Sequence, residues 1–367
     1  MKRRTSQGGE ARAISAGGQI CVNALFALFF AIKFGVPSRV LAGMFPGPMP
    51  SPKLLHTVAI TLAFSLPAFS ADKDEGFTDP DAAGPDFAVQ GEYEGHECGA
   101  QVIAMGGGKF HIVGWENGLP GAVENATKRV ELDGERVGNR IAFRGNGWDG
   151  AIEDGKLTGT SDEGGKFDLK RVERTSPTLG AKSPAGAIVL FDGTTADAWE
   201  GGKMDDRKLL FCGTKSKHSF GDCTLHIEFR TPFMPGARGQ GRGNSGVYLQ
   251  DRYECQVLDS FGLSGENNET GGIYTISKPK LNMCFPPLAW QTYDIEFSGA
   301  KFDADGKKTR NALMSVKLNG MLVQEKVEVP HTTTAAGRKE GPEAGPIQLQ
   351  NHGTPVFYRN IWVVEKK

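Results

Sequence analysis

Short runs in which apolar and polar residues alternate recur along most of the chain. They include residues 110–113, 140–143, 224–229, 292–297, 315–318 and 358–364. A period of two places every second side chain on the same face of an extended strand, and Gly, Asn and Asp between the runs supply turns. No stretch longer than about ten residues keeps a helical period. The pattern predicts an all-β protein built as a sandwich or a barrel.

Two β domains are predicted, with a boundary at residues 175–186. This segment is rich in Pro, Ser and Gly and has no apolar face, which is typical of a linker. Residues 87–174 are predicted to form a small β-meander or barrel-like module, whose Trp115 and Trp148 we assign to core or rim packing rather than to sugar stacking. Residues 71–86 are expected to be a flexible tether. Residues 187–367 form the larger domain.

The first 70 residues are predicted to be an export signal preceded by an over-extended start. Lys53, the apolar residues 54–64 and the small residues around Ala68 and Ser70 match the three parts of a secretory signal. Met49 stands just upstream, so we expect translation to start there and cleavage to occur near Ser70. The alternative is an N-terminal anchor at residues 20–36. In both cases the bulk of the protein is expected outside the cytoplasm, in the periplasm or the extracellular space.

Removing the export segment changes the charge of the chain. Residues 1–70 hold seven basic residues and one acidic residue, which leaves 35 basic and 42 acidic residues and a net charge of −7. Such a surface does not favour nucleic acid or an anionic membrane as a partner. A neutral substrate such as a sugar is compatible with it.

Five cysteines follow the export segment, namely Cys98, Cys212, Cys223, Cys255 and Cys284. An oxidising compartment favours disulfides, and an odd number leaves one thiol free. We expect these cysteines to be structural bridges, because no pair has the CxxC spacing of a zinc or redox site. The sequence also lacks an HExxH motif and a Cys/His set, so we predict no metal and no cofactor.

The larger domain contains an ordered series of motifs. In chain order they are Phe191-Asp192-Gly193, Gly243-Asn244-Ser245-Gly246, Tyr253-Glu254-Cys255-Gln256, Gly271-Gly272-Ile273-Tyr274, Leu318-Asn319-Gly320, Gln348-Leu349-Gln350-Asn351-His352 and Tyr358-Arg359-Asn360. This series resembles the 3-keto-disaccharide hydrolase family over about half of the chain. The resemblance implies a concanavalin A-like jelly-roll sandwich with a sugar site on the concave face of a curved sheet.

The residues themselves are compatible with such a site. Side chains alternate along a strand, so Glu254 and Gln256 point to the same face, and Asp259 lies at or beyond the strand end. The strand is similar to the acidic catalytic strand of glucanases that share the jelly roll. Those enzymes carry acidic residues at alternate positions, and Gln256 interrupts that pattern here. A standard pair of carboxylates is therefore not expected.

A 3-keto sugar, the substrate that the resemblance implies, calls for different chemistry. The ketone acidifies the neighbouring C2–H, so that a base removes this proton, the C1 substituent is eliminated and water adds back. Glu254 or His352 is the candidate base, and Asp259 is the second candidate proton carrier. The candidate substrate-binding residues are Asn244, Gln256, Tyr274, Lys278 and Gln350. We expect residues 236–243, a Gly/Arg loop, to form a mobile lid beside the site.

The partner that this hypothesis adds is an upstream sugar 3-oxidase that makes the ketone. The alternatives are a non-catalytic carbohydrate-binding protein that uses the same face and a purely structural surface protein. The sequence predicts no oligomeric state.

Overall fold

The computed structural model describes residues 76–122 and 129–366. The predicted export signal and the alternative anchor at residues 20–36 lie outside this part of the chain. Within the described residues, no helix combines the length and apolar character needed to cross a membrane.

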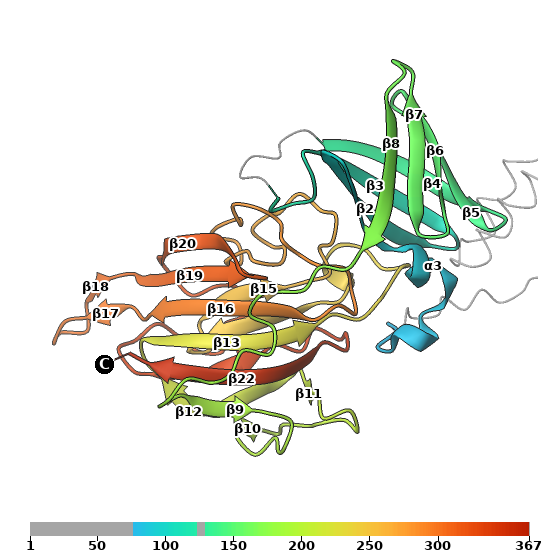
Figure 1. The fold of residues 1–367 in the computed structure, drawn as a ribbon. Helices are drawn as coiled ribbons and strands as arrows, with labels where there is room; N and C mark the ends of the chain where they lie inside the picture. Colours follow the sequence, from blue (N-terminus) through green and yellow to red (C-terminus); the bar gives the residue numbers. More distant parts are fainter. Residues whose placement is uncertain (1–75, 123–128, 367) are drawn as a thin grey trace, which may run out of the picture. The chain divides into compact units, whose positions relative to one another are not determined.

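The N-terminal module is a closed barrel of eight antiparallel strands, in which each strand pairs with the next and β8 pairs with β1 (Figure 1). The strands are β1 (Gly91–Gly95), β2 (Cys98–Gly106), β3 (Lys109–Glu116), β4 (Arg129–Val137), β5 (Arg140–Gly145), β6 (Trp148–Glu153), β7 (Lys156–Ser161) and β8 (Lys166–Val172). Every second residue points inward, and apolar residues such as Val102, Phe110 and Ile141 form the barrel core.

The C-terminal domain is a sandwich of two antiparallel sheets. The five-stranded sheet has the order β10-β12-β21-β14-β15 and the seven-stranded sheet has the order β11-β22-β13-β16-β19-β20, with β9 paired to β22. Their bounds are β9 (Ile188–Phe191), β10 (Trp199–Glu200), β11 (Leu210–Phe211), β12 (Thr214–Phe220), β13 (Cys223–Arg230), β14 (Ser245–Leu249), β15 (Tyr253–Val257), β16 (Gln291–Ser298), β19 (Ala312–Leu318), β20 (Met321–Val329), β21 (Gly345–Leu349) and β22 (Phe357–Glu365). A short hairpin, β17 (Lys301–Phe302) and β18 (Lys308–Arg310), extends beyond the second sheet.

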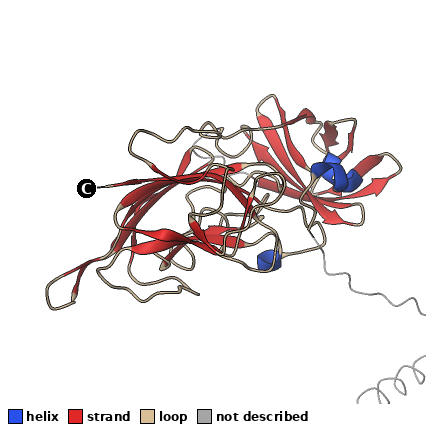
Figure 2. Cartoon of the chain, turned by 90° about the horizontal axis from the view of Figure 1, so that it is seen from below, coloured by secondary structure: helices blue, strands red, loops and turns tan. Residues whose placement is uncertain are grey.

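Strands make up nearly all of the regular structure of the described residues, as Figure 2 shows. The buried core of the sandwich is made by inward residues of both sheets, for example Leu225 and Ile227 from one and Val247 and Leu349 from the other. The prediction of an all-β protein with a barrel-like module followed by a sandwich is therefore confirmed.

The described helices are short, namely η2 (Pro80–Ala82), α3 (Gly84–Val89) and η3 (Gly239–Gly241). The first two fall in and just after the segment expected to be a tether. Asp79 caps η2 by accepting a hydrogen bond from the amide of Asp81. Asp86 of α3 accepts from the amide of Gly108 at 2.9 Å. These contacts tie α3 to the β2–β3 turn at one end of the barrel.

The linker between the domains is held against the outer face of the seven-stranded sheet. Gly180 donates its amide proton to Glu228, and Thr178 donates to Asp294 at 2.7 Å. Asn360 and Trp362 both donate to the carbonyl oxygen of Ala181. The linker thus binds this sheet through hydrogen bonds, which explains how a segment without an apolar face is held there.

A buried histidine lies at the centre of that contact. His226 has no exposed surface; its Nδ1 lies 2.6 Å from Asp294 and its Nε2 lies 3.7 Å from Glu228. Burial alone would lower the pKa of His226, but the hydrogen bonds to Asp294 and Glu228 outweigh it and raise the pKa to about 8. Burial opposes the ionisation of Glu228. The contact with His226 and the hydrogen bonds from Asn360 and Arg359 outweigh this effect of burial and lower the pKa of Glu228 to about 2. The cluster is thus a charged anchor for the linker.

The expectation of disulfide bridges was wrong, because all five cysteines of the described part are free. Cys223 and Cys255 point into the sandwich core as small apolar side chains, alternating in phase with Leu225 and Val257. Burial raises the pKa of both thiols to about 12. Their spacing therefore reflects strand periodicity and not covalent pairing.

We predict that His226→Gln destabilises the protein more at pH 6 than at pH 9. The folded pKa of about 8 exceeds the ordinary value of 6.5, so the stabilisation by His226 is complete below pH 6.5 and is lost as the pH rises through 8. The difference between the two pH values should be about 2 kcal/mol, measured by urea unfolding. An equal cost at both pH values would show that His226 is not charged in the folded protein.

Candidate functional site

The candidate site lies on the outer face of the five-stranded sheet, around the β14–β15 hairpin. Tyr248 is opposite Glu254, and Gly246 is opposite Gln256. The residues between them, such as Val247 and Cys255, point into the core. Because side chains alternate, Tyr248, Glu254 and Gln256 share the face that points away from the core. The sequence prediction for Glu254 and Gln256 agrees with this arrangement.

Glu254 is a buried carboxyl group with one side-chain partner. It is 2% exposed, and Tyr248 donates its hydroxyl proton to Glu254 Oε2 at 2.8 Å. Oε1 lies over Gly246, where a Cβ atom would approach it to 2.1 Å. Among the described residues, no donor binds Oε1. The absence of a side chain at position 246 thus creates the space that this carboxyl group occupies.

The surroundings of Glu254 favour its protonated form. Burial raises the pKa of Glu254 to about 8, and the hydrogen bond from Tyr248 offsets only part of that effect. The same burial, together with the nearby carboxylate, raises the pKa of Tyr248 well above its ordinary value. Near neutral pH, Glu254 therefore exchanges a proton readily while Tyr248 keeps its own.

Tyr248 can serve both protonation states of Glu254. Its hydroxyl group lies 2.8 Å from Glu254 and 2.9 Å from the carbonyl oxygen of Thr334, and it accepts a hydrogen bond from Gln350 at 3.2 Å. A phenol has a single proton. When Glu254 is ionised, Tyr248 can donate to it; when Glu254 is protonated, Glu254 can donate to Tyr248, whose proton then turns to Thr334.

A cluster of side-chain amides lies next to this pair. Gln240 Oε1 accepts hydrogen bonds from Asn244 at 3.0 Å and from Gln256 at 3.1 Å, and Gln240 donates to the carbonyl oxygen of Asn268 at 2.9 Å. The Oδ1 atom of Asn244 is buried and has no hydrogen-bond partner. Unpaired buried acceptors are rare in folded proteins, which makes Asn244 a candidate site residue.

Two loops hold the hairpin in place. Thr333 Oγ1 accepts a hydrogen bond from the Glu254 amide at 3.0 Å, and the buried Arg252 donates to the carbonyl oxygens of Lys339 and Glu343. On the other side, the amide of Tyr274 donates to the Glu254 carbonyl oxygen at 3.1 Å. Tyr274, itself half-buried, therefore lies beside Glu254 as the sequence hypothesis requires.

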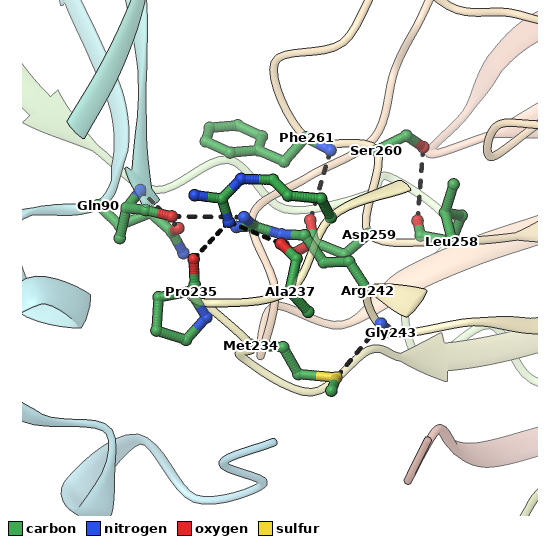
Figure 3. Close-up of polar contacts among 12 residues, drawn as sticks. Gln90, Met234, Pro235, Ala237, Arg242, Gly243, Leu258, Asp259, Ser260 and Phe261 are labelled. Atoms are coloured by element: carbon green, nitrogen blue, oxygen red, sulfur yellow. Dashed lines mark hydrogen bonds and ion pairs between the residues drawn. The ribbon is translucent and has the colours of Figure 1, made fainter. Parts of the chain in front are cut away.

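Asp259 is engaged elsewhere, at the contact between the sandwich and the barrel (Figure 3). Its Oδ2 pairs with Arg242 Nε at 2.6 Å, and both side chains are buried. Arg242 also donates to the carbonyl oxygen of Ala104 in β2 at 3.3 Å. Asp259 thus acts as the buried partner of an arginine that joins the two domains, and we assign it no step of the chemistry below.

His352 and Lys278 are exposed, and among the described residues neither side chain has a hydrogen bond or an ion pair with Glu254. Gln350, in contrast, reaches the pair through Tyr248. The predicted residues therefore divide into a group that the structure connects, namely Glu254, Gln256, Asn244, Tyr274 and Gln350, and a group that it does not, namely Asp259, His352 and Lys278.

Sequence reasoning missed Tyr248, Gly246 and Gln240. For the first two a signal existed, because the three residues between Leu249 and Tyr253 set a hairpin register that places Tyr248 opposite Glu254. Gln240 carries no such signal, since it belongs to the Gly/Arg loop and not to a strand. Its hydrogen bonds show that this loop contacts the site through Gln240.

Comparison with models of known protein families gives one family match. The model of a family described as a 3-keto-alpha-glucoside-1,2-lyase-like domain matches residues 186–364. No curated protein matches the chain.

Three crystal structures of Parabacteroides distasonis proteins, each provisionally assigned as a glycosyl hydrolase, are similar to this chain. The first is 35% identical, covers 50% of this chain and 85% of its own, and has a TM-score of 0.47. The second is 17% identical, with coverages of 50% and 94% and a TM-score of 0.36. The third is 18% identical, with coverages of 49% and 99% and a TM-score of 0.35.

We predict that Glu254→Gln stabilises the fold at alkaline pH but not at acidic pH. Below pH 4.5 the carboxyl is protonated in both states, whereas between pH 4.5 and 8 only the unfolded chain loses the proton. The native protein is therefore destabilised, relative to the variant, by about 4 kcal/mol more at pH 8.5 than at pH 4.5. Urea unfolding at both pH values measures this difference. The exposed Glu296 supplies the control variant Glu296→Gln. A flat result for Glu254→Gln would contradict the assignment.

Proposed function

Because residues 186–364 form a domain of the 3-keto-alpha-glucoside-1,2-lyase-like family, we propose that this domain cleaves 3-keto-glycosides at the Glu254 face. The family supports a carbohydrate substrate and a sugar-cleaving activity. The observation that supports this particular site is the buried carboxyl group of Glu254, with its pKa of about 8 and its contact to Tyr248.

The proposed reaction begins with removal of the C2 proton of the sugar by the Glu254 carboxylate. The C2–H bonding electrons move into the C2–C3 bond and onto the C3 ketone oxygen, giving an enolate. When the enolate collapses, the C1–O bond breaks and the aglycone leaves with its electron pair, taking up a proton. Addition of water across the resulting double bond completes hydrolysis, whereas release before this step completes a lyase reaction.

The residues around Glu254 fit these steps. A base whose pKa lies near the working pH takes and returns a proton with little loss in either direction. Tyr248 hydrogen-bonds with Glu254 in both states, so the pair needs no rearrangement of the backbone. Gln350, whose side-chain amide makes one hydrogen bond among the described residues, to Tyr248, is the candidate donor to the enolate oxygen or a sugar hydroxyl. The amide protons of Asn244 and Gln256 bind Gln240 and Asn268, so these two residues shape the site. The C3 ketone must be made beforehand, so we propose a sugar 3-oxidase as the upstream partner.

The test of the proposal is incubation of the purified protein with 3-keto-trehalose and, in parallel, with unoxidised trehalose. We expect sugar release from the ketone alone, because only the ketone acidifies C2–H. A 1,2-unsaturated product of the 3-keto-2-hydroxyglycal type would indicate the lyase outcome, and glucose with 3-keto-glucose the hydrolase outcome. Binding of the ketone without any product would support the carbohydrate-binding alternative and contradict the proposal.

We predict that kcat/KM for the 3-keto substrate rises with pH and levels off above about pH 8, since Glu254 must be ionised to act as the base. Glu254→Gln should lower kcat by about 10²–10⁴-fold with little change in KM. Tyr248→Phe should keep activity but shift the midpoint of the profile upward, because it removes the hydrogen bond that favours the carboxylate. Glu296→Gln is the control with native kinetics. A profile that falls over the same range would assign Glu254 as an acid instead.

We also propose that the protein is exported, with a signal that begins at Met49 and is cleaved near Ser70. The support is the sequence pattern alone: a lysine, an apolar segment and small residues in order. Expression in a Gram-negative host followed by intact-mass analysis of the periplasmic fraction should give a mature chain that begins close to residue 71. A full-length chain in the membrane fraction would support the anchor at residues 20–36.

A further inference from the structure

The eight-stranded barrel is filled at one end and hollow at the other. At the filled end, Val102, Phe110, Ile141 and Ile152 meet on the barrel axis as buried side chains. Helix α3 (Gly84–Val89) covers this end: Val89 packs on the barrel core, and its carbonyl oxygen accepts a hydrogen bond from Tyr93 at 2.7 Å. An eight-stranded barrel either fills its interior with side chains or encloses one small ligand. In this barrel, side chains fill the interior over only part of its length.

The other end holds a cavity of about 730 Å³, which is within the range of small-molecule sites. Its wall is formed mainly by inward residues of the strands. The apolar members are Ala100, Ile112, Leu132, Phe143, Trp148, Leu157, Phe167 and Leu169. Since the same end carries the β1–β2, β5–β6 and β7–β8 turns, the cavity opens between these turns.

Glycines keep the aromatic rings out of the lumen. A Cβ atom on Gly150 would lie 2.5 Å from Cζ of Phe143, and one on Gly159 would lie 2.5 Å from Cζ of Phe167. Each ring therefore rests on the backbone of the neighbouring strand and lines the wall. The rings of Phe143 and Phe167 are stacked with centroids 6.3 Å apart, and Trp148 adjoins Phe167 at 5.3 Å. The three rings thus form one aromatic cluster on the cavity wall, in which Phe143 is buried and Trp148 and Phe167 are half-buried.

Among the described residues, those that line the mouth of the cavity are mainly acidic. The charged residues that line it are Glu97, Glu116, Asp162, Glu163 and Lys166, together with His96. Four carboxylates against one lysine disfavour an anionic ligand at close range. Inside the cavity, the apolar wall would leave a charged or strongly polar group without partners.

We propose that the barrel binds a small uncharged molecule with an apolar body, which lies against the aromatic wall while its polar end faces the acidic mouth. This site is separate from Glu254 and from the sugar chemistry proposed there. Trp148, which the sequence assigned to packing, is half-buried and lines the cavity.

The test uses the full chain and the fluorescence of 1-aminoanthracene, an uncharged aromatic probe. We expect its emission to rise on binding with one site per chain. Linear alkanols from hexanol to dodecanol should displace it, each added methylene tightening binding by about fourfold until the cavity is full. Carboxylates of the same chain length should compete at least tenfold more weakly. Absence of probe binding, or equal competition by carboxylates and alkanols, would overturn the proposal.

A variant that fills the cavity locates the site. Gly114 lines the cavity, and a Cβ atom there would make only ordinary van der Waals contacts, the nearest being the Val130 carbonyl oxygen at 3.7 Å. Gly114→Phe should abolish probe binding, whereas Thr160→Phe, on the exposed outer face of β7, should leave it unchanged. Both variants should retain the Glu254-dependent activity if that activity exists. Native-like probe binding by Gly114→Phe would place the probe elsewhere and contradict the assignment.

Discussion

The candidate site depends on one costly feature, a carboxyl group buried on a sheet face with a phenol as its only side-chain partner. A buried carboxylate is stable only where charges or several donors surround it. Among the described residues, Glu254 has only Tyr248 as a side-chain partner, so the effect of burial dominates and the protonated form is favoured. Glu228, on the other sheet, is the contrast: four donors surround it, and it is ionised. The same residue type thus has opposite charge states on the two faces of one sandwich.

The two outer faces of the sandwich also differ in what covers them. On the seven-stranded sheet, the interdomain linker occupies the polar cluster around His226. On the five-stranded sheet, Gln350 and Tyr274 remain half-buried beside Glu254. The domain that matches the family, residues 186–364, includes every residue of the Glu254 site.

Strand periodicity explains what the sequence could predict. It placed Glu254 and Gln256 on one face and identified the all-β architecture, because alternation is a local property. It could not assign Asp259, which lies two residues beyond the end of β15, where alternation stops and a long-range partner, Arg242, determines its role. For the cysteines, strand periodicity gave the right answer, because Cys223 and Cys255 alternate in phase with core residues. The expectation of an oxidising compartment nevertheless led to a prediction of disulfides, which the free thiols contradict. The meeting of Asn244 and Gln256 at Gln240 depends on a loop conformation, for which no periodic pattern exists.

The central claim is that Glu254 remains protonated in the folded protein near neutral pH. The most direct test is a ¹³C NMR titration of the side-chain carboxyl carbons of glutamate-labelled protein, with the Glu254 signal assigned by its absence in Glu254→Gln. The account predicts that this signal titrates with an apparent pKa of about 8. A midpoint near the ordinary glutamate value of about 4.3 would show that the carboxyl is solvated, and would contradict the role of Glu254 as a base poised at neutral pH.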